Sequence, residues 1–273
     1  MSLLLAHQVQ QKHCLVIGAG EVALSRVHHM IRANAKITVV AGSRDAHPEI
    51  LQLSKANKIH NLILRDYQSS DLQLYEDEPQ TKFDIDNIGA DDYNRIVEDA
   101  NKRFAVVCCC IDDYELSTKI YYQCKYLHLP VNIADKPPMC DFYFGSMFNQ
   151  DSLQIMISTN GKSPRLLRLI KDEIARTFKD VDLNKAVDNL GAIRAKLRSS
   201  VVIDDDLVSI DTRMNWIKSL TDFFTLREWS LLDIDEESAG RIVSYFPDFP
   251  SHDYEKFSQV ANPQLANLKI ANS

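Results

Sequence analysis

An aspartate that follows a short apolar segment is the residue of this chain best placed to do chemistry. Residues 129–134 read Leu-Pro-Val-Asn-Ile-Ala, which is typical of a parallel strand covered on both faces. In open α/β sheets, ligands bind at the carboxyl ends of such strands. Asp135 is therefore a candidate general base. The alternative is that it only begins the Asp-Lys-Pro-Pro turn, a position that suits aspartate.

A glycine-rich turn near the N-terminus predicts a dinucleotide site. Residues 18–23 read Gly-Ala-Gly-Glu-Val-Ala, between a strand expected over 13–17 and a helix expected over 21–33. Gly18 permits a tight turn, and Gly20 allows backbone N–H groups to approach a pyrophosphate. Ala23 is small enough for close packing of the helix on the sheet. A glycine turn without a ligand is the alternative.

The loop after the second expected strand, 36–40, leaves the choice between NAD and NADP open. The acidic residue that usually binds the ribose hydroxyls at the end of this strand is missing, since residues 41–45 read Ala-Gly-Ser-Arg-Asp. Asp45 comes late, and Arg44 could instead contact a 2′-phosphate.

A third candidate is an anion site at the start of a helix expected over 165–178. Ser163 is a suitable N-cap and Pro164 a suitable first helical residue, while Arg165 and Arg168 add positive charge. An ordinary capped helix with a solvated basic face is the alternative. Five apolar residues of this helix form a stripe typical of packing or of a subunit interface: Leu166, Leu167, Ile170, Ile174 and Phe178.

The six cysteines show no zinc-ligand spacing, and we expect no metal site. Cys108, Cys109 and Cys110 lie inside an expected strand, where neighbouring side chains face opposite sides of the sheet. They cannot converge on one ion and are expected to be packed as buried thiols. His28 and His29 are also not expected to share an ion, because the side chains of neighbouring helix residues diverge by roughly 100°.

The order of elements predicts a doubly wound parallel sheet of the Rossmann type. Further strands are expected over 59–64, 104–111 and 129–134, with helices over 115–126 and 91–102, the latter within an acidic insertion at 68–100. A strand over 153–158 follows, then the helix at 165–178 and helices from 183 onward, including 206–226 and 228–245. Residues from 247 are expected to be loosely ordered.

Composition narrows the possible functions. The 273 residues are 45% hydrophobic and carry a formal net charge of -7, which argues against a general nucleic-acid surface. No apolar segment approaches the roughly 20 residues needed to cross a bilayer, and the first eleven residues lack a basic leader. We expect a cytoplasmic protein without nucleic-acid or membrane partners.

Three segments together resemble the siroheme synthase family: residues 18–22, residues 132–137 with 140–145, and residues 157–165. The chain is most similar to the fungal members, which are bifunctional precorrin-2 dehydrogenases and sirohydrochlorin ferrochelatases. The resemblance covers residues 5–200. It implies NAD-dependent oxidation of a tetrapyrrole, insertion of ferrous iron as the second substrate, and a homodimer. It implies three domains: a dinucleotide-binding domain (1–145), a small α+β dimerisation segment (146–200) and an α-helical C-terminal domain (201–273).

The resemblance also assigns residues by position. The essential carboxylate falls on Asp135. The dinucleotide contacts fall on Gly18, Gly20, Glu21, Val22, Ala41, Gly42, Ser43 and Cys110. The substrate carboxylates are expected near Asn160, Ser163, Arg165 and Arg168. Two alternatives stay open: an NAD(P)-dependent oxidoreductase acting on another small anionic substrate without a chelatase step, and a non-catalytic dinucleotide sensor.

Overall fold

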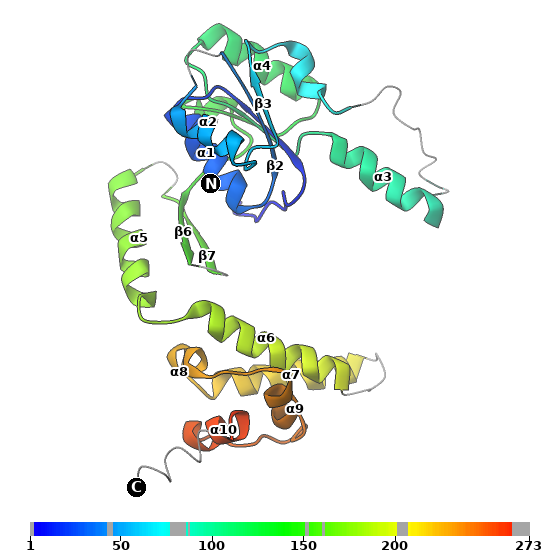
Figure 1. Ribbon diagram of the computed structural model, residues 1–273, viewed down its shortest axis with the longest axis vertical. Coiled ribbons are helices and arrows are strands. Elements are labelled where there is room, and N and C mark those ends of the chain that lie inside the picture. Colours follow the sequence, from blue (N-terminus) through cyan, green and yellow to red (C-terminus); the bar gives the residue numbers. More distant parts are fainter. Residues whose placement is uncertain are drawn as a thin grey trace. The chain divides into compact units, whose positions relative to one another are not determined.

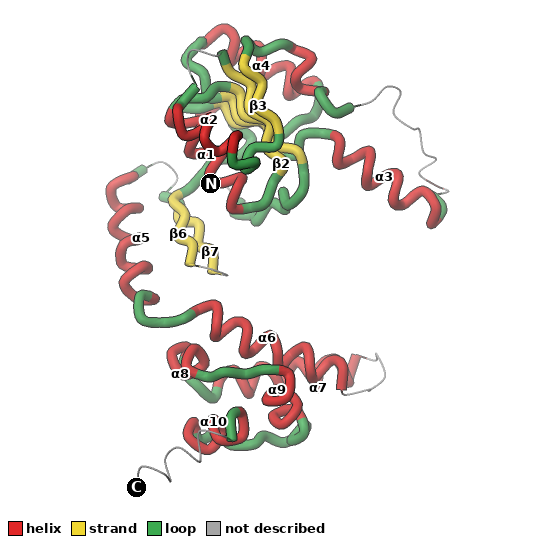
Figure 2. Tube along the Cα trace, viewed as in Figure 1, coloured by secondary structure: helices red, strands yellow, loops and turns green. Residues whose placement is uncertain are grey.

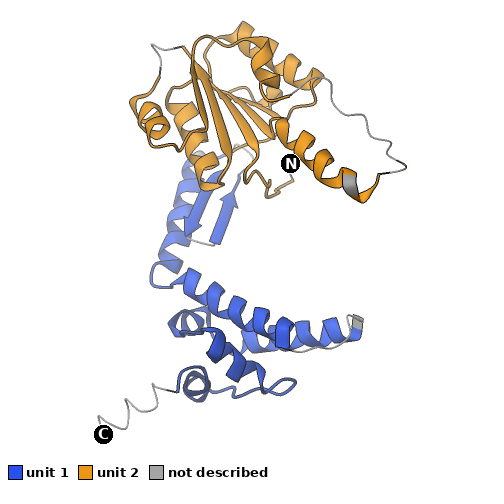
Figure 3. Cartoon of the chain, turned by 45° about the vertical axis from the view of Figure 1, so that its right-hand side comes forward, with its two compact units in different colours: residues 1, 145–273 blue, residues 2–144 orange. Residues whose placement is uncertain are grey.

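The computed structural model describes residues 3–42, 46–76, 86, 88–150, 153–159, 162–200 and 207–263. The chain forms two compact units, residues 2–144 and residues 145–273, which are coloured separately in Figure 3. Four positions singled out in the sequence, Ser43, Arg44, Asp45 and Asn160, lie outside the described residues.

The first unit is built on a five-stranded parallel sheet with the strand order β3-β2-β1-β4-β5 (Figures 1 and 2). The predicted Rossmann-type sheet is therefore confirmed. Its order reverses between β1 and β4, which is where such sheets bind ligands. The strands are β1 (His13–Ile17), β2 (Lys36–Ala41), β3 (Asn61–Leu64), β4 (Val106–Cys109) and β5 (Val131–Ile133).

Helices cover both faces of this sheet. The buried side chains of α1 (Glu21–Arg32) and α2 (Pro48–Lys55) pack against one face, and those of α4 (Tyr114–Tyr126) against the other. The helix α2 was not expected from the sequence. Cys108 lies in the core under α1, whereas Cys109 lies in the core under α4. Neighbouring cysteines of β4 therefore point to opposite faces, as the strand pattern predicted.

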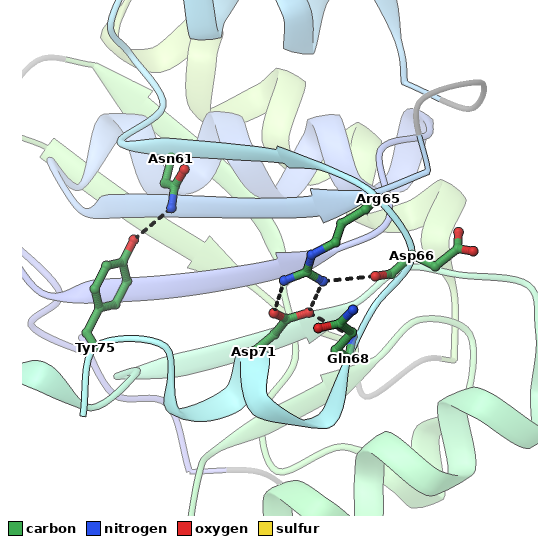
Figure 4. Close-up of polar contacts among 6 residues, drawn as sticks. All are labelled: Asn61, Arg65, Asp66, Gln68, Asp71 and Tyr75. Atoms are coloured by element: carbon green, nitrogen blue, oxygen red, sulfur yellow. Dashed lines mark hydrogen bonds and ion pairs between the residues drawn. The ribbon is translucent and has the colours of Figure 1, made fainter. Parts of the chain in front are cut away.

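The acidic segment after β3 is anchored by a buried carboxylate. Asp71, in the short 3-10 helix η1 (Ser69–Gln73), is only 1% exposed and accepts two hydrogen bonds from Arg65, at 2.8 and 2.6 Å (Figure 4). It also accepts one from the backbone N–H of Gln68. The expected helix in this segment is confirmed as α3 (Ala90–Lys102).

The second unit begins with an antiparallel hairpin of β6 (Ser146–Gln150) and β7 (Leu153–Ile157), of which only β7 was expected. The helix α5 (Pro164–Phe178) follows, with Ser163 as its N-cap and Pro164 at its start, as predicted. Phe178 stacks on Phe148 of β6 at a centroid distance of 6.2 Å, so the helix packs against the hairpin.

The rest of the second unit is a helical core formed by α6 (Leu183–Ser200), α7 (Leu207–Asp222), α8 (Leu226–Leu231), α9 (Glu236–Val243) and α10 (Tyr254–Ala261). The single helix expected over 228–245 is wrong, because the chain leaves the helical path between α8 and α9. The expectation of loose order from 247 is also wrong over the described residues 247–263, since Phe257 of α10 is fully buried, while residues 264–273 lie outside the described residues.

Asn189 of α6 explains the break between α8 and α9. Its buried side-chain amide donates to the backbone oxygens of Trp229 and Leu232, at 2.9 and 2.7 Å, and accepts from the N–H of Ile234. These bonds satisfy backbone groups that a continuous helix would have paired internally. Asp235 then caps α9 by accepting from the N–H of Ser238. The helical core thus includes residues before 200, while the three-domain division stays a prediction.

Within the described ranges, no helix combines the length and the hydropathy required to cross a bilayer.

Candidate functional site

The candidate site lies at the carboxyl edge of the parallel sheet. Ile17 at the end of β1 pairs with Cys109 of β4, which in turn pairs with Ile133 of β5. The residues that follow these strand ends, Gly18 and Cys110, therefore come out of the sheet side by side. Asp135 follows β5 at the same edge, and its charge acts on the Cys110 thiol. The structure thus brings three of the predicted site residues together.

Gly18 makes the tight turn after β1 possible. Its φ of 104° lies in a region that L-residues rarely adopt, and its N–H donates to the carbonyl of Val40 at 2.8 Å. A Cβ at this position would lie 2.3 Å from the carbonyl oxygen of Cys110. Cys110 itself donates its N–H to the carbonyl of Ile17 at 2.7 Å. The backbone of Cys110 therefore packs directly against the turn at residue 18. Only glycine fits at this position, because any side chain would overlap the Cys110 carbonyl.

Gly20 is the N-cap of α1, and the space beside it is open. A Cβ built on Gly20 would meet no atom within 4 Å, whereas Ala23 is fully buried between the helix and the sheet. Val22, in the first turn of the helix, is 40% exposed. The helix N-terminus thus presents backbone N–H groups and a positive dipole to an open space, which suits a pyrophosphate.

His47 connects this turn to the loop after β2, a role that the sequence did not indicate. The backbone N–H of His47 donates to the carbonyl of Ala19 at 2.8 Å, and the ring Nε2 lies 3.1 Å from the carboxylate of Glu21. Its Nδ1 accepts from the N–H of Glu49 and so caps α2. Ala41 and Gly42, expected to contact the cofactor, lie at the start of the loop that His47 closes.

Asp135 has an unusual backbone conformation. Its φ is 58°, in the left-handed region, and its side chain is exposed. Three of the other four described non-glycine residues with positive φ, Asn34, Asn57 and His128, follow helix ends, where this conformation is common. Asp135 instead follows a strand. Left-handed residues of this kind cost free energy and are concentrated at functional sites.

The turn that carries Asp135 is held by the chain that follows it. The Asn132 side chain donates to the carbonyl of Phe142 at 2.8 Å, and the Cys140 thiol lies 3.2 Å from the carbonyl of Ile133. The hydroxyl of Tyr143 donates to the carbonyl of Pro137 at 3.0 Å. These contacts hold residues 137–143 against β5. They therefore fix the turn between them, which contains Asp135.

Two cations that the sequence did not single out lie close to this edge. The guanidinium of Arg26 lies 4.2 Å from the centre of the Phe144 ring, and the ammonium of Lys136 lies 4.6 Å from that of Tyr114. The Nε of Arg26 and the Nζ of Lys136 are buried without a hydrogen-bond partner among the described atoms. The charge of Arg26 also acts on the thiol of Cys110 at this edge, and Lys136 directly follows Asp135 in the sequence.

The thiol of Cys110 stays protonated at neutral pH. Burial raises its pKa to about 12, although the nearby charge of Arg26 acts in the opposite direction. Cys110 therefore contributes its backbone and its packing to the site and is not a nucleophile.

The expected anion site belongs to the second unit. The N–H of Ser163 donates to the Thr159 hydroxyl at 3.1 Å, while the Ser163 side chain does not cap α5. Arg165 and Arg168 are exposed on the first turns of this helix. A joint site of these residues with Asp135 stays a prediction. No group of three or more possible metal ligands occurs among the residues that the structure describes.

Comparison with protein-family models divides the chain into three matches. Residues 5–146 match a putative NAD(P)-binding model, residues 150–177 the central model of sirohaem biosynthesis proteins, and residues 180–248 their C-terminal model.

Two fungal proteins match most of the chain. A siroheme biosynthesis protein of Saccharomyces cerevisiae is 37% identical over 85% of this chain and 87% of its own length. A siroheme biosynthesis protein of Schizosaccharomyces pombe is 32% identical over 90% of this chain and 80% of its own. A solved structure named SirC, precorrin-2 dehydrogenase, has the same fold, with a TM-score of 0.56 at 15% identity over 90% of this chain and all of that one.

Proposed function

The chain belongs to the siroheme biosynthesis family, and we propose that it is a bifunctional member. In this proposal it oxidises precorrin-2 to sirohydrochlorin with NAD and then inserts ferrous iron, its second substrate, to give siroheme. The observation that carries the proposal is the position of Asp135 in a left-handed turn at the same sheet edge as the Gly18 turn.

The residues at the end of β1 fit a bound dinucleotide. The open space beside Gly20 and the N–H groups at the start of α1 would hold the pyrophosphate. Cys110, which walls the glycine turn, would lie beneath the cofactor. When bound, the nicotinamide accepts a hydride from the substrate. The family model that matches this domain describes NAD(P) binding without choosing between the two dinucleotides. We propose that the dinucleotide is NAD.

Asp135 is proposed as the base of both reactions. Dehydrogenation removes a hydride and a proton from the macrocycle, and metal insertion releases two pyrrole protons. An exposed carboxylate at the carboxyl edge of the sheet can accept a proton in either step. The Arg26 and Lys136 cations nearby would compensate the charge that a carboxylated substrate brings to this edge.

The carboxylates of the tetrapyrrole are proposed to bind at the start of α5. Ser163, whose hydroxyl is not used for capping, and the exposed cations Arg165 and Arg168 supply hydrogen bonds and charge there. Asn160 completes the proposed set, although it lies outside the described residues.

A homodimer is also proposed. On α5, Leu166, Leu169 and Ile170 are 48%, 51% and 37% exposed, while Phe178 on the same helix packs against β6. An apolar face that stays exposed after the helix has packed on its own unit is typical of a subunit interface.

The proposal is tested by Asp135→Asn, which removes the basic carboxylate and keeps the shape of the side chain. Oxidation of precorrin-2 should fall by a factor of about 100 or more, because a positioned base supplies roughly that much. The dissociation constant of NAD should not change. The control is Asp112→Asn, which removes an exposed carboxylate after the neighbouring strand β4.

Asp135→Asn protein that oxidises precorrin-2 at the rate of the control would rule out Asp135 as the base. Iron or cobalt insertion into sirohydrochlorin, measured without nicotinamide, separates the bifunctional enzyme from a simple oxidoreductase. Wild-type protein that does not accelerate this insertion would have only the dehydrogenase activity.

A further inference from the structure

We propose that a groove between α6 and α7 is a binding site for a flat apolar ligand with carboxylates around its rim, and that a tetrapyrrole occupies it. The groove has a volume of about 410 Å³ and lies entirely within the second unit. Only the identity of the occupant rests on the proposed function.

Four cations surround this groove. Arg194 and Arg198 lie one turn apart on α6, and Arg213 and Lys218 come from α7. None of the described residues that line the groove is acidic, and Arg194, Arg198 and Lys218 form no ion pair with any residue in the described ranges. Like charges one turn apart destabilise a helix, and the chain as a whole is acidic. The cluster is therefore complementary to an anionic ligand.

The inner surface of the groove is apolar. Ile210, Met214 and Ile217 repeat at helical spacing along α7 and line it, and Met214 is 61% exposed. Trp216 and Leu220 lie on another side of the same helix and fill the helical core. Ile217 also packs against the edge of that core, whereas Ile210 and Met214 are not part of it. An apolar stripe flanked by cations marks a ligand site, and methionine adapts well to an irregular surface.

The combination of charge and apolar surface selects the ligand. A small inorganic anion would use the cations and leave the apolar stripe unoccupied. A tetrapyrrole such as sirohydrochlorin carries acetate and propionate groups around a flat ring, so its ring can lie on Ile210 and Met214 while its carboxylates meet the arginines.

The test uses the full chain and uroporphyrin, a stable porphyrin with the same acidic side groups, whose binding is followed by fluorescence anisotropy. Arg194→Gln combined with Arg198→Gln should weaken binding roughly tenfold, because two charged contacts are lost. The control is Arg227→Gln with Lys256→Gln, which removes the same charge from exposed positions of α8 and α10 outside the groove. The control should bind within about twofold of wild type.

A second variant, Met214→Glu, should weaken uroporphyrin binding while the circular dichroism spectrum and the melting temperature stay unchanged, because this side chain is exposed. Equal weakening in the groove and control variants would mean general charge attraction and would overturn the proposal, as would unchanged binding in both.

Precorrin-2 oxidation by the wild type is measured in parallel. Oxidation with no effect of the groove variants refutes the groove alone, whereas groove binding without oxidation refutes the proposed function alone.

Discussion

Asp135 occupies a backbone conformation that glycine adopts more easily. We infer that an aspartate stands there because its carboxylate is needed for the reaction. The left-handed conformation costs a residue with a Cβ about 1 kcal/mol or more. Glycine would remove that cost and lose some backbone entropy in exchange. We therefore predict that Asp135→Gly keeps the free energy of unfolding within about 1 kcal/mol of wild type and loses precorrin-2 oxidation.

Urea unfolding and a turnover assay on the same preparation measure both quantities. Large destabilisation would mean that the Asp135 side chain has a structural function, and retained turnover would mean that it has no catalytic one.

The two glycines of the turn should respond differently to substitution. Gly20→Asp should fold normally, because the space beside Gly20 is open and an acidic residue suits a helix N-terminus. It should lose NAD binding through conflict with the pyrophosphate, while iron insertion continues. Gly18→Ala should lower the melting temperature, because its Cβ would overlap the Cys110 carbonyl. Calorimetry of unfolding and titration with NAD distinguish the two effects, and normal NAD affinity in Gly20→Asp would contradict the assignment.

Sequence patterns identified Asp135, Gly18 and Gly20 because each depends on local spacing: a residue after an apolar strand, or glycines between a strand and a helix. His47, Arg26 and Lys136 were missed because their contacts join separate segments. His47, for example, follows β2 in the sequence but contacts Ala19 and Glu21, which follow β1. Its position before Pro48 indicates a helix start but not this partner.

At the scale of elements, the Arg65 and Asp71 pair attaches η1 to the end of β3. Burial alone would raise the pKa of Asp71, but the hydrogen bonds from Arg65 and from the N–H of Gln68 outweigh it and lower the pKa. Arg65→Met should lower the melting temperature by several degrees, because it leaves a buried carboxylate without its cation. The double variant Arg65→Met with Asp71→Leu should recover most of the loss. Additive losses in the double variant would contradict a specific pair.

The free energy of unfolding should depend on pH through His13, which lies at the amino edge of the sheet. His13 at the start of β1 stacks on Tyr75 at a centroid distance of 3.9 Å, and burial together with the charge of Lys36 lowers its pKa from 6.5 to about 4. The unfolded chain therefore binds a proton at a higher pH than the folded chain does. The stability that His13 contributes is complete above pH 6.5 and is lost as the pH falls toward 4. His13→Phe should remove this part of the slope in urea unfolding measured between pH 4 and 7, and an identical slope in the variant would refute it.

Elements with strong local signals were predicted and elements held by distant contacts were not. The five strands were recognised because buried apolar residues and their flanking helices repeat in a regular order. The separation of α8 from α9 was missed because Asn189, about forty residues earlier, supplies the bonds that end the helix. The order of α10 was missed because its sequence is polar apart from the residues that it buries, such as Phe257.

At the scale of the whole molecule, the exposed apolar face of α5 predicts the assembly state. Leu169→Glu places a charge in the middle of this face and should weaken self-association at least tenfold. Sedimentation velocity over a range of concentrations measures the effect. Val208→Glu, at an exposed apolar position of α7, is a matched control and should leave the assembly unchanged. A wild-type protein that sediments as a monomer at micromolar concentration would contradict the proposed homodimer.

We propose above all that Asp135 and a nicotinamide bound at the Gly18 turn act on the same macrocycle. A crystal structure of the protein with NAD and sirohydrochlorin tests it most directly. We expect the Asp135 carboxylate to lie about 3 Å from a proton-bearing atom of the macrocycle or from a water between them, with the nicotinamide ring in contact with the same ligand. A tetrapyrrole bound out of reach of Asp135, with NAD in place beside Gly18, would contradict it.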